Sequence, residues 1–332
     1  MLQKTNTILV TGGAGFIGSH LNDALLKQGH KVIVIDNLVN GTLRNMEHLK
    51  SNTNFKFIEA DILDADKMKE VCKDVDVVYH LACLGVRHSL HSPFENHRVN
   101  AEGTLNMLEA ARYNKIKKFY YISTSEVYGE AKSFPLDENS LTYPTTVYGS
   151  SKLAGENYTM SYRHFGLDVT VLRIFNNFGP RSHYEGDAGE IIPRSIINLM
   201  YGKSPIIFGD GMITRDFFYV KDTARALASL LHYDNLSNEL INIGTGVEIT
   251  MKTLLEKVVE LVNPTLKIEY LPSRPADVPR LWVDAAKLKQ LTGFTAEYDL
   301  DSGMTETINY FKELATKEEL LSKIKTINWE KK

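Results

Sequence analysis

Thr7-Ile8-Leu9-Val10-Thr11-Gly12-Gly13-Ala14-Gly15-Phe16-Ile17-Gly18 is the stretch that decides the fold. A run of β-branched residues enters a turn with glycines at 12, 15 and 18, and an amphipathic segment, 17–28, follows. The turn needs a permissive backbone, a pyrophosphate must approach closely, and the helix must pack tightly on the strand. The helix N-terminus also offers free N–H groups to phosphates. The stretch therefore predicts a dinucleotide site at Gly12, Gly15, Phe16, Ile17 and Gly18.

The next strand ends in an acid that identifies the dinucleotide. Asp36 closes the run 32–36 and lies 18 residues after Gly18, where it can bind the two hydroxyls of the adenosine ribose. Its negative charge would repel a 2′-phosphate, which favours NAD over NADP. Asn37, the following residue, is predicted to belong to the same site.

From residue 7 to about 176, short β-branched runs alternate with longer amphipathic ones. The predicted strands are 7–11, 32–36, 55–58, 76–81, 118–123 and 168–173. The predicted helices between them include 17–28, 96–113 and 145–165. Nearly continuous apolar strands separated by helices indicate a parallel sheet covered on both faces. The fold class is therefore α/β, a Rossmann-type doubly wound parallel sheet.

After about residue 177 the alternation loosens into a smaller mixed α/β lobe. Strand-like runs occur at 240–243 and 267–271, and helices are predicted near 191–201, 250–262, 284–291 and 303–314. We expect residues 1–177 plus about 215–248 to form the NAD-binding Rossmann domain. Residues from about 178 to 214 plus 249–332 then form the C-terminal lobe that binds the substrate.

Composition excludes several classes of partner. The 332 residues carry 41 acidic and 38 basic side chains, a formal net charge of −3, so no cationic excess is present to bind nucleic acid. Apolar runs are too short for a membrane span, and no signal peptide is visible, so a soluble, cytoplasmic protein without a membrane partner is expected. Cys72 and Cys83 fit no metal-ligand pattern, no metal site is predicted, and both are interpreted as small core hydrophobes.

A second motif places a phenol and an ammonium on one helix face. Tyr148 and Lys152 stand four residues apart within 145–165, and Ser123-Thr124-Ser125-Glu126 lies upstream at the end of a strand. Ligands of open α/β sheets bind at that end of the strands. Lowering the pKa of a tyrosine from 10 to near 7 requires about 4 kcal/mol, which Lys152 and a positive nicotinamide ring are expected to supply. Tyr148 is then a general base near neutral pH.

Together these motifs resemble those of the extended short-chain dehydrogenases/reductases, in particular the NAD-dependent nucleotide-sugar epimerases, dehydratases and decarboxylases. The resemblance to the group that includes UDP-glucose 4-epimerase extends over essentially the whole chain. It includes two dipeptides that follow the third and fourth strands, whose counterparts flank the adenine and the cofactor backbone: Asp61-Ile62 and Leu81-Ala82. Asn100 matches an asparagine that braces the sheet beside the cofactor.

The resemblance also implies roles for individual residues. Thr124 would bind the sugar O4, Tyr148 would take its proton, and Lys152 would hold the nicotinamide ribose. A nucleotide-diphosphate sugar is the implied substrate, with four predicted contacts: Arg87, Asn176, Arg215 and Arg274. Arg215 and Arg274 would clamp the two phosphates, because bidentate guanidinium groups suit phosphate.

Three reactions share the first step, transient oxidation at C4 to a 4-keto sugar. An epimerase returns the hydride on the other face, a 4,6-dehydratase also needs an acid and a base, and a decarboxylase needs a cationic pocket for a C6 carboxylate. Ser125 stands where one dehydratase group has an acidic residue, which disfavours that group, whereas Glu126 is compatible with all three reactions. A UDP-hexose 4-epimerase is our first hypothesis, and a non-catalytic NAD-binding protein is a remote alternative.

Three further expectations concern substrate and assembly. Arg87 is placed to meet a carboxylate or a sugar hydroxyl. Leu281 aligns with a gate position and slightly favours sugars without an N-acetyl group. Relatives pair two helices per subunit into a four-helix bundle, so a homodimer formed by 96–113 and 145–165 is predicted.

Overall fold

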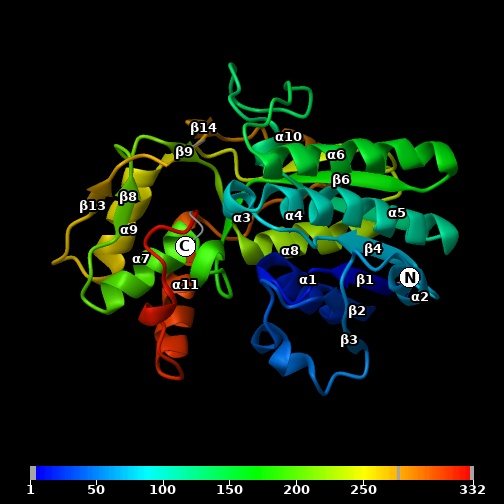
Figure 1. Ribbon diagram of the computed structural model, residues 1–332, viewed down its shortest axis with the longest axis horizontal. Coiled ribbons are helices and arrows are strands. Elements are labelled where there is room, and N and C mark those ends of the chain that lie inside the picture. The colour runs from blue at the N-terminus through cyan, green and yellow to red at the C-terminus, as the bar shows by residue number, and fades with distance from the viewer. Residues whose placement is uncertain (1–4, 275–276, 330–332) are drawn as a thin grey trace.

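The computed structural model describes residues 5–274 and 277–329, and a seven-stranded parallel sheet lies at its centre (Figure 1). The strand order is β11-β6-β5-β4-β1-β2-β3. The strands are β1 (Thr7–Thr11), β2 (Lys31–Asp36), β3 (Phe55–Glu59), β4 (Val77–His80), β5 (Lys118–Thr124), β6 (Val169–Ile174) and β11 (Leu240–Ile243). This order confirms the doubly wound parallel fold predicted from the alternating pattern.

The order reverses beside β1, and this reversal creates the ligand-binding crevice. Thr11, the last residue of β1, pairs with Ile35 of β2 on one side and with His80 of β4 on the other. Connections from β1 and β4 leave on opposite faces of the sheet, so a crevice opens at the carboxyl ends of these strands.

Helices cover both faces of the sheet, as Figure 1 shows. One face carries α1 (Phe16–Lys27) and α8 (Val220–Ser229), and an apolar cluster holds Leu21, Leu25 and Leu227 against the sheet. The other face carries α2 (Ala65–Val71), α5 (Gly103–Tyr113) and α6 (Val147–Tyr162) over a second cluster.

The predicted helix 96–113 is interrupted. The chain forms α4 (Pro93–His97), then a π-helical turn (Arg98–Glu102), then α5. A short helix before it, α3 (Val86–His91), was not predicted. The π-helical turn contains Asn100, whose contacts are described below.

The smaller lobe has its own apolar core, built from helices and short strands. Its elements are α7 (Ile191–Met200), β8 (Ile206–Phe208), α9 (Met251–Val262), β13 (Glu269–Leu271) and α11 (Leu300–Ala315). Short pairings link the lobes: β7 (Asn176–Phe178) with β10 (Phe217–Tyr219), and β9 (Thr214–Arg215) with β12 (Ile249–Thr250) and β14 (Arg280–Leu281). One assignment needs correction, because Leu288 of α10 (Ala286–Thr292) packs into the core of the large sheet. The other domain boundaries stay a prediction.

None of the helices within the described residues is long and apolar enough to cross a membrane.

Candidate active site

The glycine-rich turn leaves no room for side chains. Gly12 has φ +70°, and a Cβ there would lie 2.8 Å from the backbone nitrogen of Ala82. A Cβ on Gly18 would lie 2.8 Å from Gly13 Cα. Gly15 is the residue before α1, whose first N–H groups therefore face the crevice. Phe16 and Ile17 begin the helix, so the turn is a backbone cradle of the kind that a pyrophosphate requires.

Asp36 and its neighbours stand where β2 and β3 end. The Asp36 carboxylate accepts hydrogen bonds from Ala14 N (3.0 Å) and Leu38 N (2.8 Å), which ties it to the glycine-rich turn. Burial raises the pKa of Asp36, and these backbone donors partly oppose the rise. Asn37 Nδ2 donates to Asp61 Oδ2 at 3.1 Å, so the two predicted residues are brought together.

The ends of β3 and β4 complete this edge. The N–H groups of Leu81 and Ala82 donate to Thr11 O (3.1 Å) and Thr11 Oγ1 (3.2 Å), which presses the segment against the turn. Ile62 is buried, and Asn100 accepts from Leu84 N (2.8 Å) and donates to Leu84 O (3.0 Å).

Asn100 Nδ2 also lies 3.1 Å from Ser151 Oγ on α6. Asn100 therefore braces the segment after β4 against the helix that carries Tyr148. This is the bracing expected from the sequence, and its contact with a cofactor stays a prediction.

Thr124, Tyr148 and Lys152 are brought together beside this crevice. Thr124 ends β5 and is buried, and its side chain acts to lower the pKa of Tyr148. Tyr148 and Lys152 lie one turn apart on α6, which begins at the Thr146 cap. Lys152 Nζ is buried, donates to Ile122 O at 2.6 Å and lies 4.4 Å from the centre of the Tyr121 ring.

In the protein alone the pKa of Tyr148 is raised, and the lowering expected from Lys152 together with a bound nicotinamide ring stays a prediction. Burial raises the pKa of Tyr148, the charge of Cys83 raises it further, and the side chain of Thr124 opposes both. Burial also lowers the pKa of Lys152, whose ammonium is bonded to a backbone carbonyl. The protein alone thus holds Tyr148 as a neutral phenol, and the positive charge needed to ionise it must come from a bound ligand.

The interpretation of Cys83 as a small core hydrophobe is wrong. Cys72 is fully buried as expected, but Cys83 is only half-buried and acts electrostatically on Tyr148, Lys152 and Tyr121. Its place directly after Leu81-Ala82, at the end of β4, was the sequence signal that could have placed it in the site.

Ser125 and Glu126 follow Thr124 in a short 3₁₀ turn. Ser125 is buried, and Glu126 N donates to Thr124 Oγ1 at 3.2 Å. Burial raises the pKa of Glu126, while Arg215, Arg274 and Arg87 oppose that rise. Glu126 also raises the pKa of Tyr148, so its charge acts on both the phenol and the arginines.

A small cleft of about 30 Å³ opens between the lobes. Arg87 and Arg274 line it, together with Arg194, which the sequence analysis missed. Its apolar wall comes from α7, β8 and neighbouring segments: Ile191, Ile206, Ile207, Phe208, Ile213 and Met251. An apolar wall with cations beside it suits a nucleoside diphosphate.

The side chains predicted to contact the substrate differ in whether their polar groups already have hydrogen-bond partners within the protein. Arg215 Nη1 donates to Thr214 O and Val278 O at 2.8 Å each, and Arg274 Nε donates to Asp277 Oδ2 at 2.9 Å. By contrast, within the described residues Arg87 Nε and Asn176 Oδ1 are buried without a hydrogen-bond partner. These two groups are therefore the strongest sign of a polar ligand.

Two more acids and bases lie around Arg87. Burial raises the pKa of Glu190, the residue before α7, to about 8, opposed by the charge of Arg87. Burial also lowers the pKa of His183, whose ring meets that of Phe16 edge to face at 6.5 Å. Both residues lie in the 179–190 loop, for which no site residue was predicted. Leu281 is fully buried in an apolar cluster with Val127 and Phe175, and its gate role stays a prediction.

Comparison with known proteins gives consistent findings. Residues 9–307 match the GDP-mannose 4,6 dehydratase family. A putative UDP-glucose 4-epimerase of Methanocaldococcus jannaschii is 39% identical over 92% of this chain and 98% of its own length. A UDP-N-acetyl-alpha-D-glucosaminuronate decarboxylase of Bacillus cytotoxicus is 35% identical over 92% and 98%. The solved UDP-glucuronic acid 4-epimerase of Bacillus cereus, in complex with UDP-glucuronic acid and NAD, superposes with a TM-score of 0.87 at 35% identity, covering 93% of this chain and 99% of that one.

Proposed function

This chain belongs to the GDP-mannose 4,6 dehydratase family of extended short-chain dehydrogenases/reductases, an NAD-dependent nucleotide-sugar group, and we propose that it is a UDP-hexose 4-epimerase. The observation that carries the proposal is the meeting of Thr124, at the end of β5, with Tyr148 and Lys152 on α6, which packs against that strand. The four matches reported above support the coarser statement that the chain acts on nucleotide sugars. The choice of epimerisation is ours.

The residues around the turn fit NAD. The backbone cradle at Gly12 and Gly18 accepts the pyrophosphate, and Asp36 stands at the end of β2, where the adenosine ribose reaches in such folds. Lys152 is placed to hold the nicotinamide ribose by leaving Ile122 O. When bound, NAD supplies the oxidising power at the sugar C4 and, in an epimerase, gives it back.

Tyr148 and Thr124 do the proton chemistry in this proposal. Thr124 positions the sugar O4 through its hydroxyl, and Tyr148 removes the O4 proton as C4 is oxidised. Because burial keeps the phenol neutral in the protein alone, ionisation is linked to the arrival of positive charge. The same phenol returns the proton when the 4-keto sugar is reduced on its other face.

The substrate diphosphate is assigned to the arginines. Arg87 has an unpartnered buried Nε, and Arg274 and Arg194 line the same cleft. Asn176, with its unpartnered Oδ1, is assigned to a hydroxyl group of the sugar diphosphate. Arg215 is assigned a supporting role, since its Nη1 holds two backbone carbonyls.

A second candidate function rests on Glu126. A half-buried carboxylate that acts on both Tyr148 and the arginines is a further proton-transfer group, which an epimerase does not need. A 4,6-dehydratase or a uronate decarboxylase does have use for one. The relatives include a decarboxylase, so this alternative has support of the same kind.

A panel of UDP-glucose, UDP-galactose and their uronic acids tests the proposal, with products identified by chromatography and NMR. Inversion at C4 without loss of mass is the expected result. Release of carbon dioxide, or a 4-keto-6-deoxy product, would replace the first proposal with the second. In the first case Glu126→Gln keeps turnover within about tenfold, whereas in the second it abolishes product.

We also propose a cytoplasmic homodimer. Phe94 of α4 is 86% exposed, and Val147 and Tyr143 are exposed at the start of α6, which packs against α4. An apolar surface on adjacent helices suits pairing with a second copy. Light scattering at micromolar concentration should give twice the chain mass for the native protein and the single mass for Phe94→Glu; a native monomer would refute the pairing.

A further inference from the structure

The C-terminal segment, defined here as Glu318–Trp329, crosses from the smaller lobe to the NAD-binding lobe. It follows α11 and lies outside residues 9–307, the part that matches the family. Its contacts join three places: the segment after β2, the 179–190 loop and the substrate cleft.

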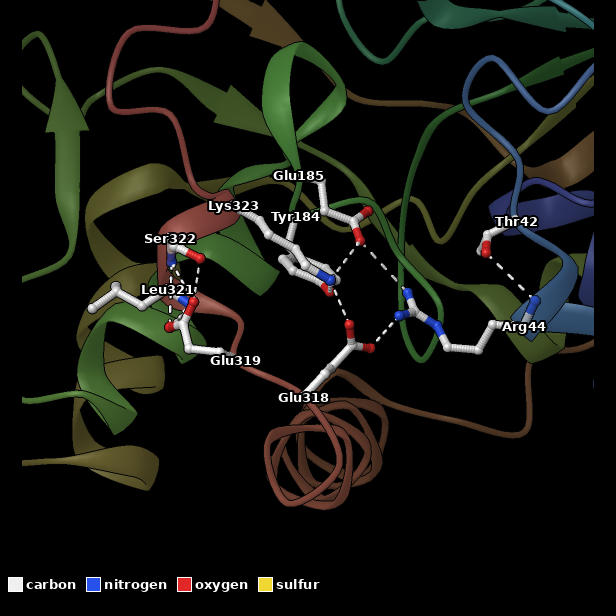
Figure 2. Close-up of polar contacts among 9 residues, drawn as sticks. All are labelled: Thr42, Arg44, Tyr184, Glu185, Glu318, Glu319, Leu321, Ser322 and Lys323. Carbon is white, nitrogen blue, oxygen red and sulfur yellow. Dashed lines mark hydrogen bonds and ion pairs between the residues drawn. The ribbon is translucent and has the colours of Figure 1, made fainter.

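A polar clasp fastens the segment at one end, as Figure 2 shows. Arg44 reaches across from the NAD-binding lobe and forms ion pairs with Glu318 and, at 3.6 Å, with Glu185 of the 179–190 loop. Lys323 pairs with Glu318 and lies 3.4 Å from the Tyr184 hydroxyl. The side chains of Arg44 and Glu318 are 35% and 25% exposed, so solvent screens their pairing less than it screens a fully exposed pair.

The Arg44 end of the clasp is anchored on the glycine-rich turn. Thr42 N donates to Ala14 O at 3.1 Å, and Asn45 Nδ2 donates to the same oxygen at 3.0 Å. Ala14 in turn donates to Asp36, which is assigned to the adenosine ribose. A displacement of Arg44 would therefore be passed through Thr42 and Asn45 to Ala14, in the turn that is expected to hold the dinucleotide.

The 179–190 loop also contacts α1, the helix that follows the glycine-rich turn. Pro180 O lies 2.9 Å from His20 Nε2, and Arg181 pairs with Asp23 at 2.9 Å. His183 meets Phe16 at the start of α1, where the phosphates are expected. The loop therefore runs along the helix that begins at the cradle.

The far end of the C-terminal segment touches the substrate cleft. Arg194 Nη2 donates to Thr326 O at 2.8 Å, and Asn328 Nδ2 donates to Gly189 O at 3.0 Å. The Trp329 ring meets Phe208 edge to face at 4.7 Å. Arg194 and Phe208 both line the cleft.

We propose that the C-terminal segment is a strap, closed by the Arg44 clasp, that holds the 179–190 loop over the dinucleotide and slows NAD release. Because the same strap touches Arg194 and Phe208, a nucleotide in the substrate cleft tightens it further. Linkage then requires that bound NAD and bound nucleotide each raise the affinity of the protein for the other, and we expect this gain to appear as slower NAD release. The inference rests on NAD binding and not on which sugar reaction follows.

Exchange of bound NAD for isotopically labelled NAD tests the strap without any turnover. The full-length NAD-loaded protein is mixed with excess labelled NAD, and retained label is followed by gel filtration. Breaking the clasp with Arg44→Met or Glu318→Gln should raise the exchange rate about three- to tenfold, as expected for a partly exposed ion-pair network. Lys50→Met is the matched control, since it removes an exposed pair with Glu47 in the same segment and should leave the rate unchanged.

A double variant that combines Arg44→Met with Glu318→Gln tests whether the two residues act through the same interaction. Non-additive acceleration, together with slower exchange of the native protein in saturating UDP, supports the strap. Native exchange rates in both Arg44→Met and Glu318→Gln would overturn it, as would fully additive effects. If Arg44→Met fails to fold, Glu318→Gln tests the clasp from the other side. A chain that exchanges NAD as predicted but turns over no sugar would contradict only the proposed function.

Discussion

Replacing Arg173 should destabilise the sheet beneath the candidate site. Arg173 of β6 and Glu156 of α6 form a bidentate ion pair, with Nε–Oε1 at 3.0 Å and Nη2–Oε2 at 2.7 Å. Their side chains are only 5% and 3% exposed. Ser123 also donates to Glu156, so the pair supports the strand end that carries Thr124. Burial would lower the pKa of Arg173, but the hydrogen bonds and charge of Glu156 raise it overall.

The expected loss of stability arises because the Glu156 carboxylate would stay buried without its cationic partner. Arg173→Met removes every charge-assisted bond to Glu156 from the guanidinium, and breaking one side of a buried pair costs about 3–5 kcal/mol. For a lobe of about 200 residues this lowers the melting temperature by about 6–20 °C. Pairing the change with Glu156→Leu removes the stranded charge, so the double variant should recover most of the loss.

Calorimetry and circular dichroism at pH 7 measure these shifts. Lys317→Met, which removes an exposed helical pair with Glu313, is the control and should leave the melting temperature unchanged. The reasoning is refuted if Arg173→Met melts within 2 °C of the native protein, about the shift expected from less than 1 kcal/mol. It is equally refuted if the double variant is no more stable than the single one.

Three other outcomes follow from the site. Tyr148→Phe should lower kcat by about 10²–10⁴-fold while NAD stays bound, measured by product chromatography; undiminished turnover would exclude Tyr148 as the base. Gly18→Ala should abolish NAD retention on gel filtration, because its Cβ meets the backbone of Gly13, whereas Gly85→Ala, with open space around it, should retain NAD. Burial raises the pKa of Glu190 to about 8, so the folded state holds an extra proton between about pH 4.5 and 8 and stability should fall as pH rises through that window. Glu190→Gln should therefore melt a few degrees above the native protein at pH 8.5 and level with it at pH 5; equal melting at both values would contradict the burial of this acid.

The large sheet could be predicted because its strands are continuous apolar runs with a glycine-rich turn after the first. Short polar helices gave no such signal: Val86–His91 has only two apolar residues in six. The π-helical turn at Arg98–Glu102 also escaped, since hydrophobic spacing reports an average period and not one widened turn. Asn100 within it was nevertheless predicted, because its residue type matched a known pattern.

The sequence could predict only those site residues that belong to a recognisable motif. Thr124, Tyr148 and Lys152 come from two adjacent elements, and the structure brings them together. Burial dominates the pKa of Tyr148 in the protein alone, where the Lys152 ammonium is bonded to Ile122 O, and the joint effect of Lys152 and nicotinamide stays a prediction. Arg194 and Glu190 escaped because only the packing of one lobe on the other turns their segment into a wall of the cleft.

The outermost strand of the sheet has a consequence for engineering this molecule. β11 pairs with β6 (Ile241 opposite Leu172), yet between them the chain passes through α7 and β8 of the smaller lobe. A fragment cut at residue 177 would expose the whole edge of β6, a template for aggregation. Transplanting the smaller lobe onto another scaffold therefore needs two junctions, one on each side of the returning strand, and we expect a simple fusion at one point to produce an insoluble hybrid.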